Sequence, residues 1–286
     1  MSVLSGILID GFSYGMILFM IAVGLSVTMG LMRVINLAHG GFALLGGAFA
    51  HWLTSIASLN YALSVILSVL AVMLIAIAME RALYKKIYQF SELQQVLATI
   101  GIAFLMIASV NLFLGSTLLP IRAPAFFSTS IDLGFRSLPA HRLVVIIAGL
   151  VIAGGLYILL DRTRFGIQLR AAVDNRDMAA SLGINTVKIY ALTFSLGAGL
   201  AAFGGILGAE LLPIEAYYPL RYMVLFLVVV AVGGMGSIAG SFFAAISLGI
   251  IDTAARYIVP DFGTVFFFIA MMIVLTLRPH GLLGRI

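Results

Sequence analysis

The chain has 286 residues, of which 63% are hydrophobic and only 9% charged, whereas soluble domains carry about 25% charged residues. This composition, with a mean hydropathy of +1.19, excludes an aqueous globular protein and indicates a polytopic membrane protein. The absence of cysteine excludes disulfides and thiolate sites, and the net charge of +5 comes from basic residues scattered between apolar stretches, which argues against nucleic-acid binding.

Eight apolar stretches follow one another along the chain, at about 20 residues per membrane crossing. Strict alternation of apolar and polar residues is absent, so the stretches predict helices rather than a barrel. The sequence therefore predicts an all-α polytopic membrane protein with about eight transmembrane segments, some of them broken, in a single domain over residues 1–286. The stretches are residues 3–31, 37–56, 61–79, 93–115, 143–160, 189–209, 224–258 and 263–277.

The distribution of Lys and Arg predicts the orientation of these segments. Loops on the cytoplasmic side of a membrane carry an excess of basic residues. By this rule the loops around 81–86, 161–188 and 278–285 are cytoplasmic, and with Arg33 this side has eleven of the sixteen basic residues. The loop at 116–142 is then an outer loop. With these loops on the cytoplasmic side, both ends of the long stretch 224–258 lie on the outer side. This stretch must therefore enter the membrane and return.

The second apolar stretch begins with polar residues and glycines. Asn36 and His39 offer hydrogen bonds, while Gly40 and Gly41 let the chain turn or let another helix approach closely. A helix break at membrane depth is tolerated only where protein or a wet cavity covers the freed backbone groups. These four residues are therefore candidates for the translocation pathway. The alternative is a polar pair that caps a helix break and contacts no solute.

A second break is predicted within residues 233–240. Breaks in the two halves of a transporter surround a midplane pathway in known transporter folds. The alternative for glycines in a membrane protein is close helix packing, to which we assign Gly197, Gly199, Gly204, Gly205 and Gly208. The pathway candidates in the second break are Gly233, Gly234, Gly236 and Ser237.

The loop at 161–188 is the longest charged stretch and is too polar to enter lipid. Apolar residues in it recur at helical spacing, which predicts one or two short amphipathic helices across the membrane face. A solvated connector would need no apolar stripe, so we favour a docking surface for another protein. The stripe consists of Leu169, Ala172, Val173, Met178 and Leu182.

The sequence offers no catalytic constellation. It lacks a phosphate-binding G-x-x-x-x-G-K-[ST] loop, the H-E-x-x-H zinc motif and the G-x-S-x-G nucleophile elbow, so the chain is not expected to be an enzyme, to bind a cofactor or to hold a metal. An ion-coupled secondary transporter or channel is the alternative, and such proteins bury a charge near the midplane. Here Asp252 and Arg256 are four residues apart and predict a local ion pair near the outer end, and Asp10 lies near the start of its segment.

Four motifs together resemble one family over nearly the whole chain. They are N-x-A-H-G at 36–40, the loop at 174–183 that leads into A-x-L-G-I-N, G-G-x-G-S-x-x-G from Gly233, and R-P-x-G-L-x-G from Arg278. With these motifs the chain resembles the permease subunits of branched-chain amino acid type ATP-binding-cassette (ABC) importers, of the LivH class. The resemblance implies a permease bundle in the bacterial inner (plasma) membrane.

The resemblance also implies a function and partners. The chain would move branched-chain or related small amino acids inward by alternating access, with a second homologous permease as a heterodimer, two cytoplasmic ABC ATPases that bind ATP and Mg²⁺, and a periplasmic solute-binding protein. The two breaks would line or gate the pathway. The residues of the loop that would couple to the ATPases are Arg164, Arg170, Ala172, Asp174, Met178, Ala179, Leu182 and Gly183.

Overall fold

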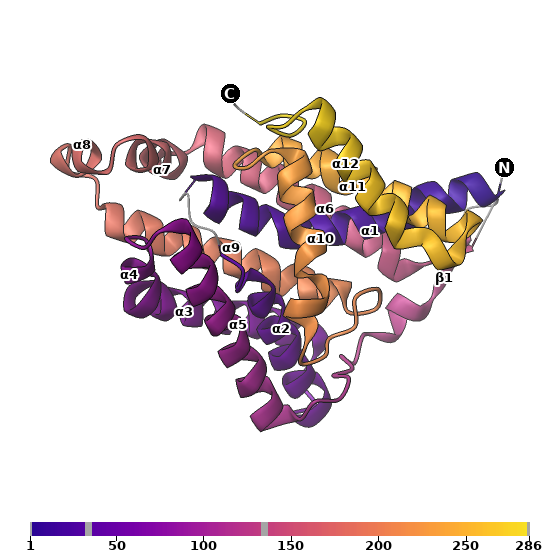
Figure 1. Ribbon diagram of the computed structural model, residues 1–286. Coiled ribbons are helices and arrows are strands. Elements are labelled where there is room, and N and C mark those ends of the chain that lie inside the picture. Colours follow the sequence, from indigo (N-terminus) through magenta and orange to yellow (C-terminus); the bar gives the residue numbers. More distant parts are fainter. Residues whose placement is uncertain (1, 32–35, 133–136, 285–286) are drawn as a thin grey trace.

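The computed structural model describes the whole chain except residues 1, 32–35, 133–136 and 285–286, so Arg33, Arg136 and Arg285 of the charge count lie outside the described residues. The described chain is a bundle of helices with one short β-hairpin (Figure 1). Its α-helices are α1 (Ser2–Ser26), α2 (His39–His51), α3 (Tyr61–Met79), α4 (Lys85–Ile87), α5 (Glu92–Leu114), α6 (Ala140–Tyr157), α7 (Arg164–Asp174), α8 (Arg176–Ser181), α9 (Thr186–Gly208), α10 (Tyr218–Gly233), α11 (Ile238–Ile258) and α12 (Gly263–Leu277).

Short turns and strands complete the chain. The π-helical turns Val27–Leu31, Trp52–Ile56, Glu80–Tyr84 and Ile158–Arg162 extend α1, α2, α3 and α6, and 3₁₀ turns occupy Ala125–Ser128 and Pro260–Phe262. Strands β1 (Ser130–Asp132) and β2 (Ser137–Pro139) pair antiparallel, with Ile131 opposite Leu138. The sequence analysis did not predict this hairpin, because its residues show no extended alternating pattern.

Every predicted apolar stretch forms helix, so the protein is an all-α multi-pass membrane protein. In the described part of the chain, six helices are long and apolar enough to cross a membrane: α1, α3, α5, α6, α9 and α11. The predicted stretch 224–258 is two helices, α10 and α11, joined by a turn at 234–237. The chain thus runs along α10 and returns along α11, as the distribution of basic residues predicted. The predicted count of eight segments is approximate.

The bundle has two distinct ends. At one end α7 and α8 project, and we call this the α7–α8 end (Figure 1). The other carries the β-hairpin, and we call it the hairpin end. There the segment before the hairpin joins the bundle, because His51 Nδ1 lies 2.6 Å from the Pro120 carbonyl oxygen and the Leu119 amide donates to Ile214.

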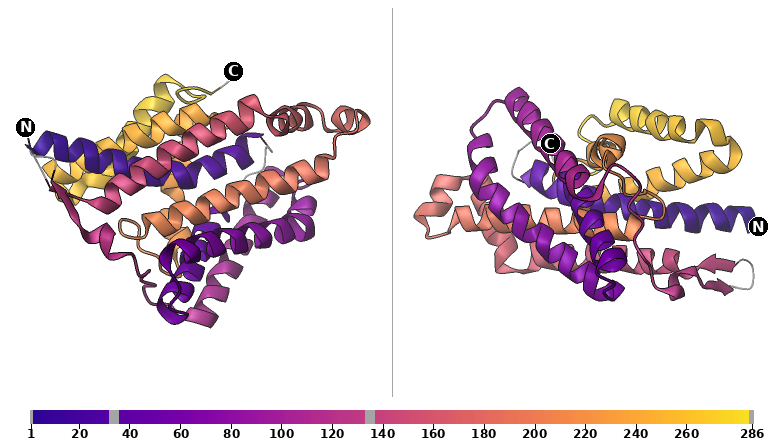
Figure 2. Two further views of the ribbon diagram at one scale, coloured as in Figure 1. Left: turned by 180° about the vertical axis from the view of Figure 1, so that it is seen from behind. Right: turned by 90° about the horizontal axis from the view of Figure 1, so that it is seen from below.

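The centre of the bundle is formed by α1 and α9. In α1 and in α9, 78% of the most apolar stretch of the helix is buried inside the protein. The corresponding share is 22% in α6 and 28% in α3. Helix α1 contacts α6, α9, α10 and α11, and runs through the bundle beside them (Figure 2). A helix that is apolar all round fits such a central position because every face meets other side chains.

Glycines let the central helices approach at backbone distance. A Cβ atom built on Gly249 of α11 would lie 2.6 Å from the Gly15 amide nitrogen of α1, and one on Gly205 of α9 would lie 2.7 Å from the Ala43 carbonyl oxygen of α2. Gly197 of α9 similarly faces the Gly24 carbonyl. Small residues at helix contacts are typical of membrane bundles, where close packing replaces the hydrophobic effect.

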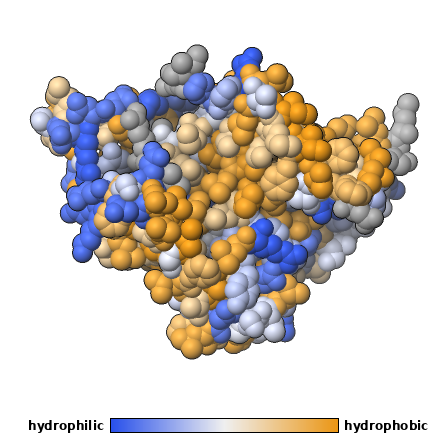
Figure 3. All heavy atoms as spheres, viewed as in Figure 1, coloured by the Kyte–Doolittle hydropathy of each residue, from blue (hydrophilic) through white to orange (hydrophobic). Residues whose placement is uncertain are grey.

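The outer helices present apolar side chains to the surroundings. Phe113 of α5 is 81% exposed and Leu74 of α3 is 67% exposed. Figure 3 shows hydrophobic residues across the middle of this face and hydrophilic residues at the α7–α8 end. In water such a surface would aggregate, whereas lipid tails or the apolar helices of another membrane subunit can cover it.

Replacing Gly249 by alanine should destabilise the bundle, because the new methyl group meets the backbone of α1. Overpacking of this kind costs about 1–3 kcal/mol. Gly101→Ala on α5 is the matched control, since nothing lies within 4 Å of its added Cβ. Thermal unfolding in detergent should show a lower midpoint for Gly249→Ala and an unchanged or higher one for Gly101→Ala. Equal midpoints for the two variants would contradict the close packing of α1 against α11.

Candidate functional site

The break before α2 makes this helix start inside the bundle. Helix α2 and the π-helical turn that extends it run without interruption from His39 to Ile56, a length of about 27 Å against the roughly 30 Å of a hydrocarbon core. Its first residue lies beside the later part of α1, because His39 Nε2 is 3.1 Å from the Ile21 carbonyl oxygen, well before the end of the π-helical turn that extends α1 to Leu31. Its other end reaches the hairpin end at His51. Helix α2 therefore starts within the membrane rather than at its surface.

Hydrogen bonds satisfy several polar groups at the described end of this break, although the buried Nδ2 atom of Asn36 has no partner among the described residues. The Asn36 Oδ1 atom accepts from the Ala38 amide at 3.1 Å and from the Tyr84 hydroxyl at 2.9 Å, and the Leu37 amide donates to Thr99 Oγ1 at 3.1 Å. These bonds connect the start of α2 to α5 and to the π-turn that extends α3. Free amides at this depth would be costly, so the contacts explain how the break is tolerated.

The pathway candidates of the first break are buried in the single chain. Asn36 and His39 are each 1% exposed. The Nε2 proton of His39 is donated to Ile21, which leaves Nδ1 as an acceptor in the neutral ring. Gly40 lies against α10, where an added Cβ would be 3.2 Å from Pro219 Cα, and Gly41 lies against Met106 of α5.

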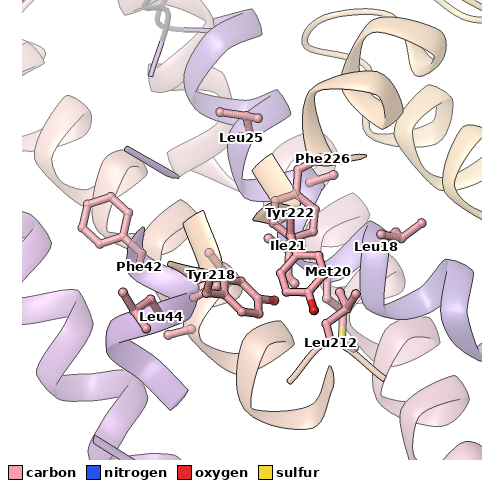
Figure 4. Packing of buried hydrophobic residues seen from close by; sticks show 14 of the residues in the cluster. Leu18, Met20, Ile21, Leu25, Phe42, Leu44, Leu212, Tyr218, Tyr222 and Phe226 are labelled. Atoms are coloured by element: carbon pink, nitrogen blue, oxygen red, sulfur yellow. The ribbon is translucent and has the colours of Figure 1, made fainter. Parts of the chain in front are cut away.

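Aromatic side chains of α10 form the wall beside the start of α2. Figure 4 shows Tyr218 and Tyr222 of α10 next to Met20 of α1, with Phe42 and Leu44 of α2 on the opposite side. The rings of Tyr218 and Tyr222 meet edge to face, with centroids 4.7 Å apart. Helix α2 thus packs most extensively on α9, and also on α3, α5 and α10.

The second break is a tight turn at the α7–α8 end. Gly234 and Gly236 have φ values of 95° and 80°, which side chains other than glycine rarely adopt. Ser237 caps α11, because its Oγ atom accepts from the Gly240 amide at 3.0 Å. Gly233 packs against Gly240 and Ser241. The three glycines and the serine of the second break therefore join α10 to α11 at one end of the bundle. They do not contact Asn36 or His39.

The C-terminal motif packs onto this turn. The Leu282 amide donates to the Val232 carbonyl at 2.7 Å, and the Leu283 amide donates to Gly233 at 3.2 Å. Gly281, with φ of 81°, lies against Gly234. The contact between these two motifs was not predicted from the sequence, although the glycines in each motif are typical of close backbone contact.

The loop at 161–188 forms the two helices α7 and α8. Thr163, Asn175 and Asn185 cap the starts of α7, α8 and α9 with their side chains. Helix α8 ends in a Schellman motif: Gly183, with φ of 83°, donates to Ala180, and the Ile184 amide donates to Ala179 at 3.0 Å. The prediction of short amphipathic helices is therefore confirmed.

The two helices have a buried face and an exposed face. Leu169, Ala172 and Ala179 are buried in a cluster with Val27 in the π-helical turn after α1 and Leu160 in the one after α6, and Val173 is half-buried against it. The predicted stripe is therefore divided, because part of it attaches the loop to the bundle. Its other two residues are exposed: Met178 is 60% exposed and Leu182 is 75% exposed.

The basic residues of the loop also differ in their surroundings. Arg170 turns back to the bundle, where its Nη1 atom donates to the Leu160 carbonyl at 2.6 Å and lies 3.3 Å from Asp161 Oδ1. Arg164 and Asp174 are exposed. The eight residues expected to couple thus separate into three that hold the loop, Arg170, Ala172 and Ala179, and five on its outer surface.

Two carboxylates within the helices, Asp10 and Asp252, are paired with arginines at the hairpin end. Arg256 Nε donates to Asp252 Oδ2 at 2.7 Å, which confirms the local pair predicted from their spacing. Asp10 pairs with Arg142 of α6 and accepts from the Tyr257 hydroxyl at 2.8 Å. Within the described ranges, no group of three or more His, Asp or Glu residues could hold a metal ion.

Comparison with protein families gives one match. The family described as branched-chain amino acid transport system / permease component matches residues 7–275. The chain is 27% identical to the high-affinity branched-chain amino acid transport system permease protein LivH of Escherichia coli K12, over 96% of this chain and 94% of that protein.

Other relatives are equally extended. The chain is 26% identical to the permease protein BraD of Pseudomonas aeruginosa over 97% of this chain and 95% of that protein. It is 25% identical to the probable LivH of Methanocaldococcus jannaschii over 95% and 90% of the two chains. No solved structure matches the chain.

Asn36→Leu should destabilise the protein more than Tyr84→Phe. Leucine leaves the Ala38 amide and the Tyr84 hydroxyl without their acceptor, and each buried group left unsatisfied costs about 1–3 kcal/mol. Phenylalanine removes one bond and leaves Asn36 bonded to Ala38, at a cost of about 1 kcal/mol. Thermal midpoints in detergent measure the difference. Equal shifts would show that Asn36 does not support the break.

Proposed function

The chain belongs to the family of branched-chain amino acid transport permeases, and we propose that it is the transmembrane subunit of an ATP-driven ABC importer that moves branched-chain or related small amino acids inward. It is a multi-pass inner-membrane protein and a transport component rather than a catalytic enzyme. The observation that carries the proposal is the exposed surface of α7 and α8. Buried side chains attach these helices to the bundle, while their outer face remains exposed.

The α7–α8 end fits the role of an ATPase docking surface. Met178 and Leu182 are apolar side chains that face outward on a segment too polar for lipid. Helix caps and the Schellman motif fix their positions, so a partner would find a rigid ridge. Arg164, Asp174 and Gly183 lie on the same exposed loop. The charge pattern places this end in the cytoplasm, where ATPase subunits would bind ATP and Mg²⁺.

The proposed mechanism is alternating access. Helix α2, which starts inside the bundle, and the turn between α10 and α11 correspond to the two breaks predicted from the sequence, and transporters rock around such broken segments. Approach of the ATPases would push α7 and α8, and their buried cluster with Val27 would transmit the push to α1. Asn36, His39, Gly40 and Gly41, with the glycines of the second break, would line or gate the path.

The proposed partners follow from what one chain lacks. It has no phosphate-binding loop, so two cytoplasmic ATPases would supply ATP hydrolysis. A second, homologous permease would complete the pathway as a heterodimer, and a periplasmic binding protein would deliver the solute to the hairpin end. An ion-coupled transporter is less well supported, because Asp10 and Asp252 each face an arginine near one end of the bundle.

Co-purification tests the proposal. The tagged protein is extracted from its native membrane in a mild detergent, the bound chains are identified by mass spectrometry, and ATPase activity is measured with and without branched-chain amino acids. We expect an ABC ATPase and a second permease, with ATPase activity stimulated in the presence of the solute and its binding protein. Isolation of a lone chain in several detergents would favour the ion-coupled transporter instead.

Leu182→Glu should uncouple the transporter. A carboxylate on the ridge would be desolvated against the ATPase, so solute-stimulated ATPase activity and uptake should fall by about tenfold or more, the ratio that corresponds to about 1.4 kcal/mol. Insertion should be unchanged, since the side chain lies outside the bundle. The control is Gln89→Glu, which adds the same charge to an exposed position in the loop between α4 and α5. Normal uptake by Leu182→Glu at equal expression would remove α8 from the docking surface.

A further inference from the structure

A charged cavity lies at the hairpin end between α1, α6, α10, α11 and α12. Its volume is about 740 Å³. Small-molecule sites typically enclose about 300–1,000 Å³. Its charged lining residues come from four of these helices and are Asp10, Arg142, Arg221, Asp252 and Arg256. The docking ridge and the two helix breaks make no use of this cavity.

The carboxylates are buried and the guanidinium groups are more accessible. The side chain of Asp252 is 3% exposed, whereas that of its partner Arg256 is 54% exposed. The side chain of Asp10 is 10% exposed and that of Arg142 is 25% exposed. In each pair the carboxylate is therefore more deeply buried than the side chain of its arginine.

Such paired charges are complementary to a zwitterion. Binding a single charge here would leave one member of a pair without its counter-charge, which is costly in a buried site. A zwitterion avoids this cost, because its ammonium group can replace the guanidinium at the carboxylate while its carboxylate accepts hydrogen bonds from that guanidinium. Arginine suits the second contact, since its planar group binds carboxylates in a bidentate manner.

A second carboxylate adds to this preference. Asp10 stands in the same lining, so two buried carboxylates face the cavity.

The rest of the lining is apolar and aromatic. Val224 and Leu225 of α10 and Phe268 of α12 line the cavity, together with Tyr14 and Tyr222. An aliphatic side chain would be desolvated against these residues. A charged side chain would find no free counter-charge in the lining, because Arg221, the remaining charged residue, is paired with Glu215. The cavity thus combines charges for the backbone of an amino acid with a wall for its side chain.

We propose that this cavity is a binding site for a zwitterionic α-amino acid with an aliphatic side chain. Asp252 and Asp10 bind its ammonium group, and Arg256 and Arg142 bind its carboxylate. This inference rests on the proposed function and deepens it, since it places a site for the transported solute within this chain at the hairpin end. If the pairs served only to tie α1, α6 and α11 together, no solute would bind.

The absence of cysteine allows a direct test by solute protection. Thr253→Cys places the sole thiol of this chain in the lining, and Ser137→Cys on exposed β2 is the control. Each variant is assembled with its partner subunits in proteoliposomes, and the rate of modification by a charged thiol reagent is measured with and without L-leucine. At a leucine concentration of about ten times its Kd, modification of Thr253→Cys should slow about tenfold, and that of Ser137→Cys should not change.

Two leucine analogues and one variant identify the chemistry. 3-Methylbutylamine lacks the carboxylate and 4-methylpentanoate lacks the ammonium group, so neither should protect the thiol. Asp252→Asn should abolish protection by leucine in the Thr253→Cys background. Protection that survives Asp252→Asn, or that either analogue matches, would overturn the zwitterion site.

Uptake measured on the same proteoliposomes separates the two proposals. If Thr253→Cys transports leucine but leucine gives no protection, the cavity is not a solute site, and the proposed function stands. If the assembled wild-type complex takes up no branched-chain amino acid, the proposed function itself fails.

Discussion

Close backbone contact along α1 is the constraint on which the rest of the bundle depends. Lipid tails are as apolar as the helices, so burial alone gives the helices no reason to associate, and dispersion at short range must do so. Gly15 of α1 meets α11, and Gly24 meets Gly197 of α9 at backbone distance. Because α1 carries Asp10 near one end and reaches Val27 at the other, its placement positions both the charged cavity and the cluster that holds α7 and α8.

The same helices connect the two ends of the molecule. Helix α11 begins at the glycine turn on the α7–α8 end and carries Asp252 and Arg256 to the cavity, a length of about 31 Å for its 21 residues. The C-terminal motif holds that turn through hydrogen bonds to Val232 and Gly233. In the proposed cycle, the push on α7 and α8 would reach the cavity through α1, which carries Asp10, and through α11, which packs on α1.

The candidate residues differ in how far the sequence could place them. The helical spacing in the loop at 161–188 predicts short helices but cannot assign their faces, so Ala172 and Ala179 turn inward while Met178 and Leu182 remain outside. Asn36 and His39 were recognisable as a helix break, and their hydrogen bonds to Tyr84 and Ile21 depend on segments far away in the sequence. The pair Asp252 and Arg256 was predictable because four residues make one helical turn. The pair Asp10 and Arg142 was not, since 132 residues separate its members.

Composition and local pattern by themselves determined that this is a membrane protein, which stretches form its apolar helices and to which family its motifs point. These properties depend on neighbouring residues, and the cost of exposing backbone groups or charges to lipid leaves few alternatives. Only the tertiary structure decided which apolar faces stay exposed and which meet other helices of the chain, because leucine, valine and alanine suit both environments equally. It also decided that α2 starts beside α1 inside the bundle, that the two glycine motifs share one turn and that five charged residues line one cavity.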